Sequence, residues 1–338
     1  MKKVSIQDIA KSLQVSKSTV SLVLNGRGDE KRIRKETQQK ILDFAKEQNY
    51  SPNHLARGLS RGKSETIGLI VPNISDNFYA RIAKRIETKA IQHGYNVVFG
   101  SADEDPKREA QLIDIMLNRQ IDGLIIASTQ QNQKEIKQLK AKQFPFVLID
   151  RHYPDIETTY VIVENSNGIK TTVNHLLKKG RRNIGFVTLE SGLEAMEQRL
   201  KGYKTAMLEA EVKVNLNWIQ KLAYQDYAVQ MEPAIQSLTS EQDEVDAIIF
   251  ATHYLTLSGI RELRKANISI PKQVAVASFD GLDGFDLIDP PVTAISQPVD
   301  QMGDTAVELL LKKLDNHTDE LIQMELPLDF VIRKSCGE

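Results

Sequence analysis

The sequence is poor in the residues that hold small secreted proteins together and in the runs that span membranes. It contains a single cysteine, Cys336, so an intrachain disulfide and a cysteine-based metal site are both excluded. No run of about 18 apolar residues occurs, and the first residues lack the apolar segment of a secretion signal. We therefore expect a soluble, cytoplasmic protein with no membrane partner.

The near-neutral net charge of −1 hides an uneven distribution of charge along 338 residues, a length that favours two or three domains. Residues 1–64 hold 14 Lys and Arg against 6 Asp and Glu, a net of +8, which leaves 30 against 39 for the rest. A small basic segment joined to an acidic body is typical of a phosphate-binding module tethered to a part that does not touch nucleic acid. A merely solvated lysine-rich surface would give the same charge. The choice between these two interpretations therefore depends on the motif within this segment.

That motif, in residues 4–26, predicts two short helices joined by a tight turn. Apolar residues recur at helical spacing in both helices, at Ile6, Ile9, Ala10, Leu13, Val20, Val23 and Leu24. Ser16 is a good N-cap for the second helix, and Lys17, Ser18 and Ser21 follow on its first turns. Base edges meet the recognition helix of a helix-turn-helix at these turns, so the sequence predicts DNA binding.

The segment that follows predicts a third helix and then a hinge. Residues 37–49 repeat apolar residues in a way that closes a small bundle, after a polar loop at 26–32. Pro52 is well placed to begin another helix, but residues 54–62 are few and include two glycines. We expect this piece to become helical only on a partner.

From Glu65 onward strands and helices alternate. The predicted strands are 66–72, 96–100, 123–127, 146–150, 183–188, 247–251 and 273–279, and the predicted helices are 79–94, 106–119, 168–179, 199–211, 229–238 and 255–266. Continuous apolar strands separated by amphipathic helices indicate parallel sheets covered on both faces. The fold class is α/β, with an all-α head and two doubly wound subdomains, and a ligand is expected beyond the carboxyl ends of the strands, between the subdomains.

Several motifs in fixed order give the chain a specific resemblance. They are Ile6-x-Asp8-Ile9-Ala10 followed by Val15-Ser16-x-x-Thr19-Val20-Ser21-x-Val23-Leu24-Asn25, then Asn49-Tyr50-x-Pro52-Asn53-x-x-Ala56-Arg57-x-Leu59, Ile67-Gly68-Leu69-Ile70-Val71-Pro72, Arg199-Leu200-x-Gly202-Tyr203, Phe279-Asp280, and Pro290-Pro291-x-Thr293 through Gln297-Pro298 to Met302-Gly303. Over essentially its whole length the chain resembles the lac repressor (LacI/GalR) family of bacterial transcription regulators.

The resemblance implies a homodimer that binds near-palindromic double-stranded operator DNA and has a core similar to periplasmic sugar-binding proteins. It implies three parts: a helix-turn-helix domain at 1–50, a hinge at 51–63, and an effector-binding and dimerisation domain at 64–338. Within the last, the N-subdomain is expected at about 64–165 plus 296–324 and the C-subdomain at about 166–295 plus 325–338. An effector in the cleft would set the separation of the two hinges, and the sequence leaves open whether it releases the protein from DNA or recruits it.

The residues that the resemblance assigns to DNA lie in the head and the hinge. They are Ser5, Ser16, Lys17, Ser18, Thr19, Ser21, Leu22, Asn25, Asn53, Ala56, Arg57 and Leu59. Lys17 and Ser18 suit hydrogen bonding to base edges, whereas Leu22 suits only an apolar feature such as a thymine methyl. Leu59 matches the leucine that wedges into the minor groove and kinks the central step. The loop at 26–32 is about three residues longer than in many relatives, which leaves its phosphate contacts open.

The resemblance likewise assigns residues to a small-molecule effector, most simply a carbohydrate. They are Phe78, Tyr79, Asp103, Asp150, Arg151, Arg199, Thr252, His253, Asp280 and Gln297. A carboxylate accepts from two vicinal hydroxyls, an arginine donates in a fork, and an aromatic face packs on a sugar ring. Asp103, Asp150 and Arg151 are equally consistent with strand-end caps or hinge ion pairs, and Phe78 and Tyr79 with packing at the start of a helix.

Two other classes of protein fit the sequence less well. Gly62-Lys63-Ser64 looks like the end of a P-loop, but Arg57 stands where the first glycine is required, and the six histidines show no metal-binding spacing. We therefore expect no enzyme, no metal and no cofactor. A transport-associated binding protein would need an export signal and no basic head.

Thr252-His253 is a departure from the family, many of whose members have Asn-Asp here. The change removes a carboxylate and supplies a group that titrates near neutral pH. One interpretation is that His253 only caps the next helix or packs at the subunit surface. The other is an effector that differs from a simple neutral sugar at this edge, by carrying an acidic group or by presenting hydrogen-bond acceptors.

Overall fold

A computed structural model describes residues 4–48, 50, 63–240, 244–316 and 320–337. The chain divides into two compact units, residues 1–64 and residues 65–338. We call the first the head and the second the core, and each is considered by itself.

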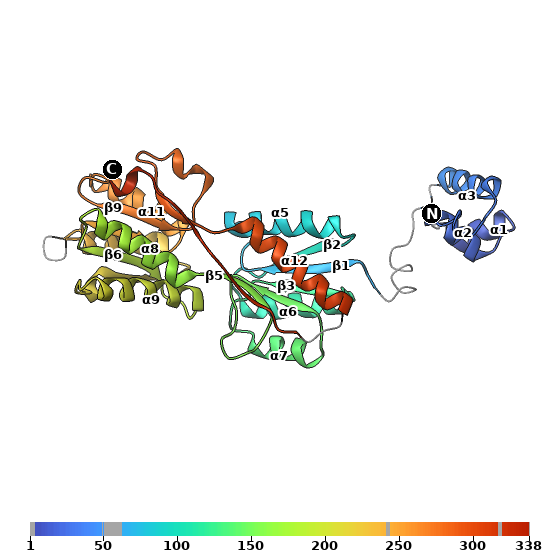
Figure 1. Ribbon diagram of the computed structural model, residues 1–338, viewed down its shortest axis with the longest axis horizontal. Helices are drawn as coiled ribbons and strands as arrows, with labels where there is room; N and C mark the ends of the chain where they lie inside the picture. The colour runs from blue at the N-terminus through green and yellow to red at the C-terminus, as the bar shows by residue number, and fades with distance from the viewer. Residues whose placement is uncertain (1–3, 49, 51–62, 241–243, 317–319, 338) are drawn as a thin grey trace. The chain divides into compact units, whose positions relative to one another are not determined.

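The described residues of the head form a bundle of three helices, α1 (Ile6–Ser12), α2 (Lys17–Leu24) and α3 (Lys35–Glu47) (Figure 1). Ser5 begins α1 with a reciprocal capping box, in which its hydroxyl accepts from the Asp8 backbone and the Asp8 carboxylate accepts from the Ser5 backbone. The expected N-cap of α2 is confirmed, because Ser16 Oγ accepts from Thr19 N at 3.0 Å. The centre of the bundle is apolar and consists of the buried residues Ile9, Ala10, Val20, Val23, Ile41 and Ala45.

The loop at 26–32 is organised around one aspartate. Asp29 accepts from Lys35 Nζ at 2.7 Å and from the Gln38 amide at 2.9 Å, and these bonds lower the pKa of Asp29 from its ordinary value. Gln38 also donates to the Ile33 carbonyl at 2.8 Å. The long loop is therefore tied to the start of α3.

The core contains two sheets of six strands each, which confirms the prediction of two doubly wound subdomains. We call the sheet-containing halves the N lobe and the C lobe. The strands of the N lobe are, in spatial order, β11 (Gln323–Leu326), β5 (Tyr160–Val163), β4 (Phe146–Ile149), β3 (Gly123–Ile126), β1 (Thr66–Val71) and β2 (Asn96–Ser101). All neighbouring pairs in this sheet are parallel. Its helices are α5 (Asn77–Gln92), α6 (Pro106–Asn118), α7 (Gln133–Ala141) and α12 (Val299–Asn316).

The C lobe repeats this plan with one strand reversed. Its strands are, in spatial order, β12 (Asp329–Val331), β10 (Thr293–Ser296), β9 (Ala275–Phe279), β8 (Ala247–Phe250), β6 (Ile184–Leu189) and β7 (Ile219–Leu222). Only the β10–β12 pair among them is antiparallel. Its helices are α8 (Asn165–Lys178), α9 (Glu194–Glu209), α10 (Tyr227–Leu238) and α11 (His253–Lys265), with short 3-10 turns at Leu216–Trp218, Asp283–Asp286 and Lys334–Cys336.

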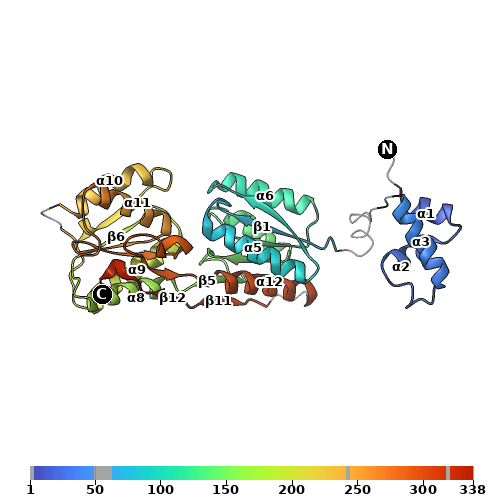
Figure 2. The ribbon, with the colours of Figure 1, turned by 90° about the horizontal axis from the view of Figure 1, so that it is seen from above.

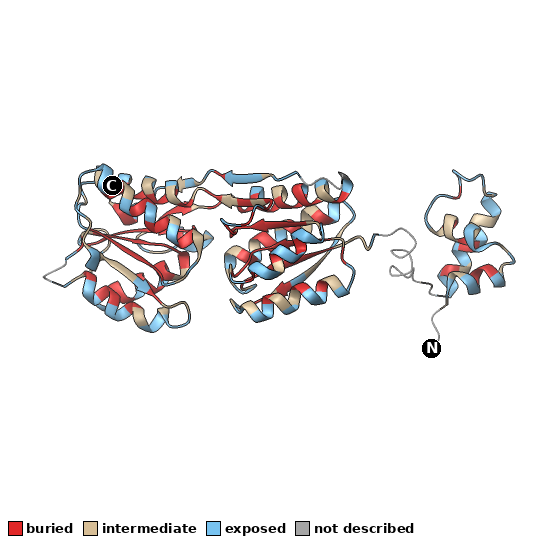
Figure 3. Ribbon diagram, turned by 90° about the horizontal axis from the view of Figure 1, so that it is seen from below, coloured by how far each residue is buried: buried red, intermediate tan, exposed pale blue. Residues whose placement is uncertain are grey.

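The chain passes between the lobes three times, after β5, after β10 and after β11. The second passage returns α12 to the N lobe, where it lies beside α5 (Figures 1 and 2). Arg85 of α5 pairs with Asp304 of α12 through two hydrogen bonds, and Lys89 pairs with Glu308 at 2.7 Å. The central strands of both sheets are buried on both faces, and the helices turn polar residues outward (Figure 3).

The predicted strands agree with the structure to within two residues at each end. Among the predicted helices of the core the largest difference is at α9, which begins at Glu194 rather than at Arg199, and helices α7 and α12 were not predicted. Five strands were not predicted, namely β5, β7, β10, β11 and β12.

Candidate functional site

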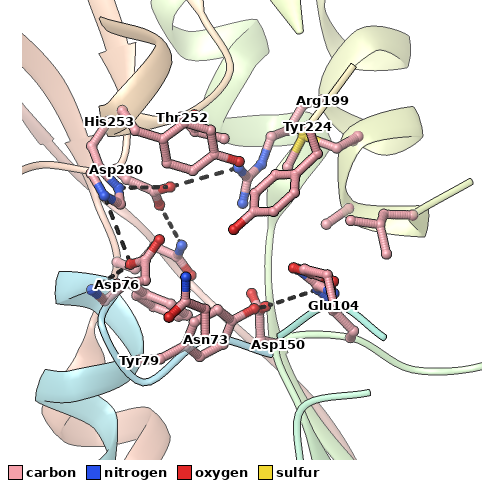
Figure 4. A pocket seen from close by; sticks show the side chains of 17 residues that line it. Asn73, Asp76, Tyr79, Glu104, Asp150, Arg199, Tyr224, Thr252, His253 and Asp280 are labelled. Carbon is pink, nitrogen blue, oxygen red and sulfur yellow. Dashed lines mark hydrogen bonds and ion pairs between the residues drawn. The ribbon is translucent and has the colours of Figure 1, made fainter. Parts of the chain in front are cut away.

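A cavity lies in the core where the carboxyl ends of the two sheets face each other (Figure 4). The volume within it that is open to the centre of a water molecule is about 50 Å3. The lining residues are Asn73, Asp76, Phe78, Tyr79, Glu104, Asp150, Arg151, Leu193, Ala195, Met196, Arg199, Tyr224, Thr252, His253, Tyr254, Asp280 and Gln297. The cavity thus has an N-lobe wall and a C-lobe wall.

Nine of the ten residues expected to bind an effector line this cavity, and Asp103 does not. Asp103 is exposed, accepts from Ser101 Oγ at 2.8 Å and pairs with Arg108 of α6. Its neighbour Glu104 faces the cavity instead. The expectation for Asp103 was wrong by one position, because the backbone turns in the left-handed region at both residues, with φ of +52° and +56°.

On the N-lobe wall, Arg151 is the central cation. It donates two parallel hydrogen bonds to Glu104, at 2.8 and 2.6 Å, and its Nε lies 3.6 Å from the Asp150 carboxylate. Tyr79 of α5 donates to Asp150 Oδ2 at 2.6 Å. Burial nevertheless raises the pKa of Asp150, against the opposing effects of Arg151 and Tyr79. This wall therefore holds a carboxyl group whose ionised form is disfavoured by burial and favoured by Arg151 and Tyr79.

On the C-lobe wall, Arg199 of α9 is only 2% exposed and is held from several sides. Its Nε donates to Asn165 Oδ1 at 2.8 Å, its Nη1 donates to the Ala251 carbonyl at 2.7 Å, and its guanidinium lies 3.6 Å from the centre of the Phe279 ring. The same Nη1 is 3.8 Å from Asp280 Oδ2. The planar fork is thus fixed against an aromatic face, an arrangement that lysine could not reproduce.

Asp280 is the main anion of the C-lobe wall. Burial alone would raise the pKa of Asp280, but Arg199, His253 and the amide of Gln297 together lower it from the ordinary value. Gln297 Nε2 donates directly to Asp280 Oδ1. Asp280 follows β9 directly with a φ of +68°, as Asp150 follows β4 with a φ of +62°. Left-handed backbone at non-glycine residues costs free energy and is concentrated at functional sites.

Thr252, not His253, caps α11. Thr252 Oγ1 accepts from Leu255 N at 3.4 Å, and His253 is the first residue of the helix. The capping interpretation of His253 was therefore wrong. His253 is 7% exposed and lies between two carboxylates, with Nε2 3.7 Å from Asp76 Oδ1 and Nδ1 3.8 Å from Asp280 Oδ2.

These separations make His253 a charge partner of both aspartates rather than their hydrogen-bond donor. Burial by itself would lower the pKa of His253, but Asp280 and Asp76 raise it above its ordinary value. Asp76 belongs to the N lobe and caps α5 through Phe78 N at 2.8 Å, whereas His253 and Asp280 belong to the C lobe. Burial raises the pKa of Asp76, with His253 opposing.

Several lining residues escaped sequence analysis. Asn73, Asp76 and Glu104 each come shortly after a predicted strand, so their position at a sheet edge was an available signal. Tyr224 follows β7, a short strand that was not predicted, and therefore gave no signal. Its ring and that of Tyr254 meet edge to face, with centroids 6.2 Å apart, and form an aromatic corner of the C-lobe wall.

In the head, some of the residues assigned to DNA have exposed side chains, and others already make hydrogen bonds within the head. Lys17, Ser18 and Asn25 are exposed, and Leu22 is half-buried. The hydroxyls of Ser5 and Ser16 serve as N-caps of α1 and α2, and Ser16 Oγ is also 2.8 Å from Thr19 Oγ1. Asn25 donates to the Ser21 carbonyl at 2.7 Å. Asn53, Ala56, Arg57 and Leu59, with most of the hinge, lie outside the described residues.

The described part of the chain has neither a membrane-spanning helix nor a cluster of metal ligands. Among these residues no helix is both long and apolar enough to cross a membrane. Nor do His, Cys, Asp and Glu side chains gather there in a group of three or more able to hold a metal ion.

Comparison with known proteins places both units in one family. Residues 5–53 match the family described as bacterial regulatory proteins, lacI family. Residues 64–334 match the family described as periplasmic binding proteins and sugar binding domain of LacI family.

Relatives match over nearly the full length. Catabolite control protein A of Priestia megaterium is 30% identical over 98% of this chain and 99% of its own. A ribose operon repressor of Halalkalibacterium halodurans is 28% identical over 98% of this chain and 96% of its own.

Solved structures agree. A LacI family regulator from Enterococcus faecium with bound ribose is 25% identical, with a TM-score of 0.71 over 80% of this chain and 98% of its own. The lac repressor dimer bound to operator has the same fold, with 21% identity and a TM-score of 0.87 over all of both chains. The chain belongs to the lacI family of bacterial regulatory proteins and is a DNA-binding transcription regulator with a sugar-binding domain, not an enzyme.

Proposed function

We propose that this regulator is a homodimeric repressor whose affinity for near-palindromic operator DNA is controlled by a neutral sugar bound in the core cavity. The observation that carries the proposal is the composition of the cavity. Four carboxylates, of Asp76, Glu104, Asp150 and Asp280, face two arginines and one histidine. Such a site offers many acceptors to hydroxyl groups and little net attraction to an anion.

The placement of His253 sharpens this proposal. Because Asp76 and Asp280 already flank the imidazole, its positive charge is compensated within the protein. This argues against an effector with an acidic group and favours one that presents hydroxyls to the two aspartates. The aromatic rings of Tyr224 and Tyr254 supply a surface for the C–H face of a sugar ring.

The first sugar to test is a pentose. Two full-length relatives carry the name ribose operon repressor, and a solved relative contains ribose. We expect D-ribose or another neutral monosaccharide to raise the melting temperature of the core, because a ligand of the native state stabilises it by mass action. D-ribose 5-phosphate and D-ribonate serve as anionic controls, and the Arg199→Ala variant as the control without a binding site. Stabilisation by the anionic sugars alone would contradict the proposal.

DNA binding is proposed to involve the exposed face of α2, with Lys17 and Ser18 at its start and Leu22 one turn later. The hinge residues Asn53, Ala56, Arg57 and Leu59 are proposed to complete the contact in the minor groove. Selection of the full chain on random DNA should return an inverted repeat, with an affinity that falls steeply as salt rises. Sequences without a palindrome, or an affinity insensitive to salt, would contradict it.

A further inference from the structure

Gln130 joins the two lobes at the rim of the cavity. It lies in the N-lobe segment that follows β3, and its Oε1 accepts from the backbone N–H of Glu194, 2.9 Å away. Glu194 is the first residue of α9 in the C lobe. The other end of the same amide, Nε2, donates to the His152 carbonyl in the N lobe. Both polar ends of one side chain are therefore used, and one of them crosses to the other lobe.

Helix α9 needs such a partner. The first N–H groups of a helix have no acceptor within the helix, and a polar N-cap side chain usually supplies one. The N-cap of α9 is Leu193, which has no side-chain acceptor. Gln130 supplies the acceptor from the opposite lobe. The first turns of α9 also carry Ala195, Met196 and Arg199, all of which line the cavity.

The segment that carries Gln130 is itself rigidly held. The backbone of Gln130 is left-handed, with a φ of +61°, and its N–H donates to Ser128 Oγ at 3.0 Å. Ser128 Oγ in turn donates to Glu109 Oε1 at 2.7 Å, and Thr129 N donates to Glu109 Oε2 at 2.7 Å. Glu109 of α6 is fully buried and serves only this segment and its hydroxyl groups. The amide of Gln130 is thus presented from a fixed base.

Two charged contacts between the lobes are longer. His253 and Asp76 are 3.7 Å apart, and Arg81 of α5 is 3.7 Å from Asp283 of the C lobe. Both pairs exceed the length of a hydrogen bond. The bond from Glu194 N to Gln130 is direct and has the length of a normal N–H···O bond.

We propose that Gln130 is a positioning residue, which caps α9 from the N lobe and thereby fixes Arg199 and the C-lobe wall relative to the N-lobe wall. The proposal deepens the proposed effector site, since it names a residue outside the cavity that sets its width. The contact between the lobes can be measured without any effector, so its failure and that of the sugar proposal are distinguishable.

The first test measures the distance between the lobes in the full-length protein by double electron–electron resonance spectroscopy. Spin labels are attached to Lys134→Cys on α7 and Lys201→Cys on α9, both exposed, while the native Cys336 is buried. We expect Gln130→Ala to broaden the distance distribution and shift it to longer values. The neighbouring exposed residue provides the matched control, Gln131→Ala, which should leave the distribution unchanged. A Gln130→Ala distribution that superimposes on the unsubstituted one would overturn the proposal.

The second test follows the cap itself by amide hydrogen exchange. Loss of one hydrogen bond should speed exchange at Glu194 by about fivefold, the equivalent of roughly 1 kcal/mol. Gln130→Leu keeps the size of the side chain and removes its amide, so it should behave like Gln130→Ala. Unchanged protection at the start of α9 in both variants would overturn the proposal, whereas faster exchange throughout the core would mean that Gln130 supports the fold and not this helix.

Discussion

The two walls of the cavity are built alike, but the pKa values of their aspartates shift in opposite directions. Each has an aspartate in left-handed backbone directly after a strand, Asp150 in the N lobe and Asp280 in the C lobe, and each has an arginine close to that aspartate. Yet the pKa of Asp150 is raised, chiefly by burial, and that of Asp280 is lowered despite burial. Aspartates at similar positions in two similar folds therefore differ in pKa.

The difference lies in the groups beside each carboxylate other than the arginine. Arg151 Nε is 3.6 Å from Asp150 and Arg199 Nη1 is 3.8 Å from Asp280, so the two cations are about equally near. Asp280 also has His253 and the amide of Gln297 beside it, and both lower its pKa, whereas Asp150 accepts one hydrogen bond, from the phenol of Tyr79. Burial therefore outweighs the other effects on the pKa of Asp150 but not on that of Asp280.

Replacing each arginine by alanine should show the largest difference in stability between the two walls. Arg199→Ala leaves Asp280 buried beside fewer cations and should lower the free energy of unfolding of the core by about 3–5 kcal/mol. Arg151→Ala should cost less, because Glu104 is partly exposed to water and Asp150 can take up a proton. Urea unfolding of the full chain measures both, with the exposed Lys201→Ala on the same helix as control. A larger loss for Arg151→Ala would contradict the comparison.

Neutralising the two aspartates should give effects of opposite sign. At pH 7, Asp280→Asn removes a favoured anion and should destabilise the core by roughly 1–3 kcal/mol. Asp150→Asn replaces a carboxylate whose ionised form burial disfavours, and it should be neutral or stabilising. The same unfolding experiment at lower pH should reduce the difference in free energy of unfolding between the two variants, since the cost of ionising Asp150 in the folded protein falls as pH falls. Equal losses for both variants at pH 7 would show that the walls are electrically alike.

Removing one hydroxyl tests the N-lobe wall alone. Tyr79→Phe deletes the phenol that donates to Asp150 and should cost about 1–1.5 kcal/mol. It should also raise the pKa of Asp150 further, because that bond favours the ionised form. The matched control is Tyr160→Phe, whose hydroxyl makes a longer, exposed bond of 3.3 Å to Gln323. A pKa of Asp150, followed by carbon-13 NMR, that does not rise in Tyr79→Phe would contradict the assignment.

The smallest expected effect is the pH dependence contributed by His253. Its pKa is raised in the folded protein, so its charged form stabilises the fold below the ordinary pKa of about 6.5 and this stabilisation is lost as pH rises through the folded pKa. We expect the melting temperature to fall more between pH 6 and pH 8 in the unsubstituted protein than in His253→Gln. If the melting temperatures of the two proteins changed with pH in the same way, His253 would not contribute a stabilising charge to the cavity.

The sequence predicted the central strands and the recognition helix well, and it failed where a partner comes from elsewhere in the chain. Helix α9 was expected to begin at Arg199, but it begins at Glu194, and its N-cap Leu193 has no side-chain acceptor. The acceptor is Gln130, more than sixty residues earlier and on the other lobe. Strand β7 was missed because it is short, lies at a sheet edge and contains the polar residues Gln220 and Lys221.

The residues of the cavity were also predicted only in part from the sequence. Motif order placed Arg199, Asp280 and Gln297 together although the chain separates them by up to about a hundred residues. It did not distinguish Asp103 from Glu104, because the backbone is left-handed at both residues and turns Glu104 rather than Asp103 toward the cavity. It also left His253 open, because the two flanking carboxylates come from different lobes.

The three passages of the chain between the lobes also order events at the ribosome. The N-lobe sheet needs α12 packed on it and β11 beside β5, so it cannot be completed until residue 326 has been synthesised. The C-lobe sheet waits for β12, at residues 329–331. The head requires only the first 50 or so residues and can form long before either sheet closes. A nascent chain therefore presents a folded DNA-binding bundle ahead of an unfinished sensor, and the sensor can control the bundle only after residue 331 has been synthesised.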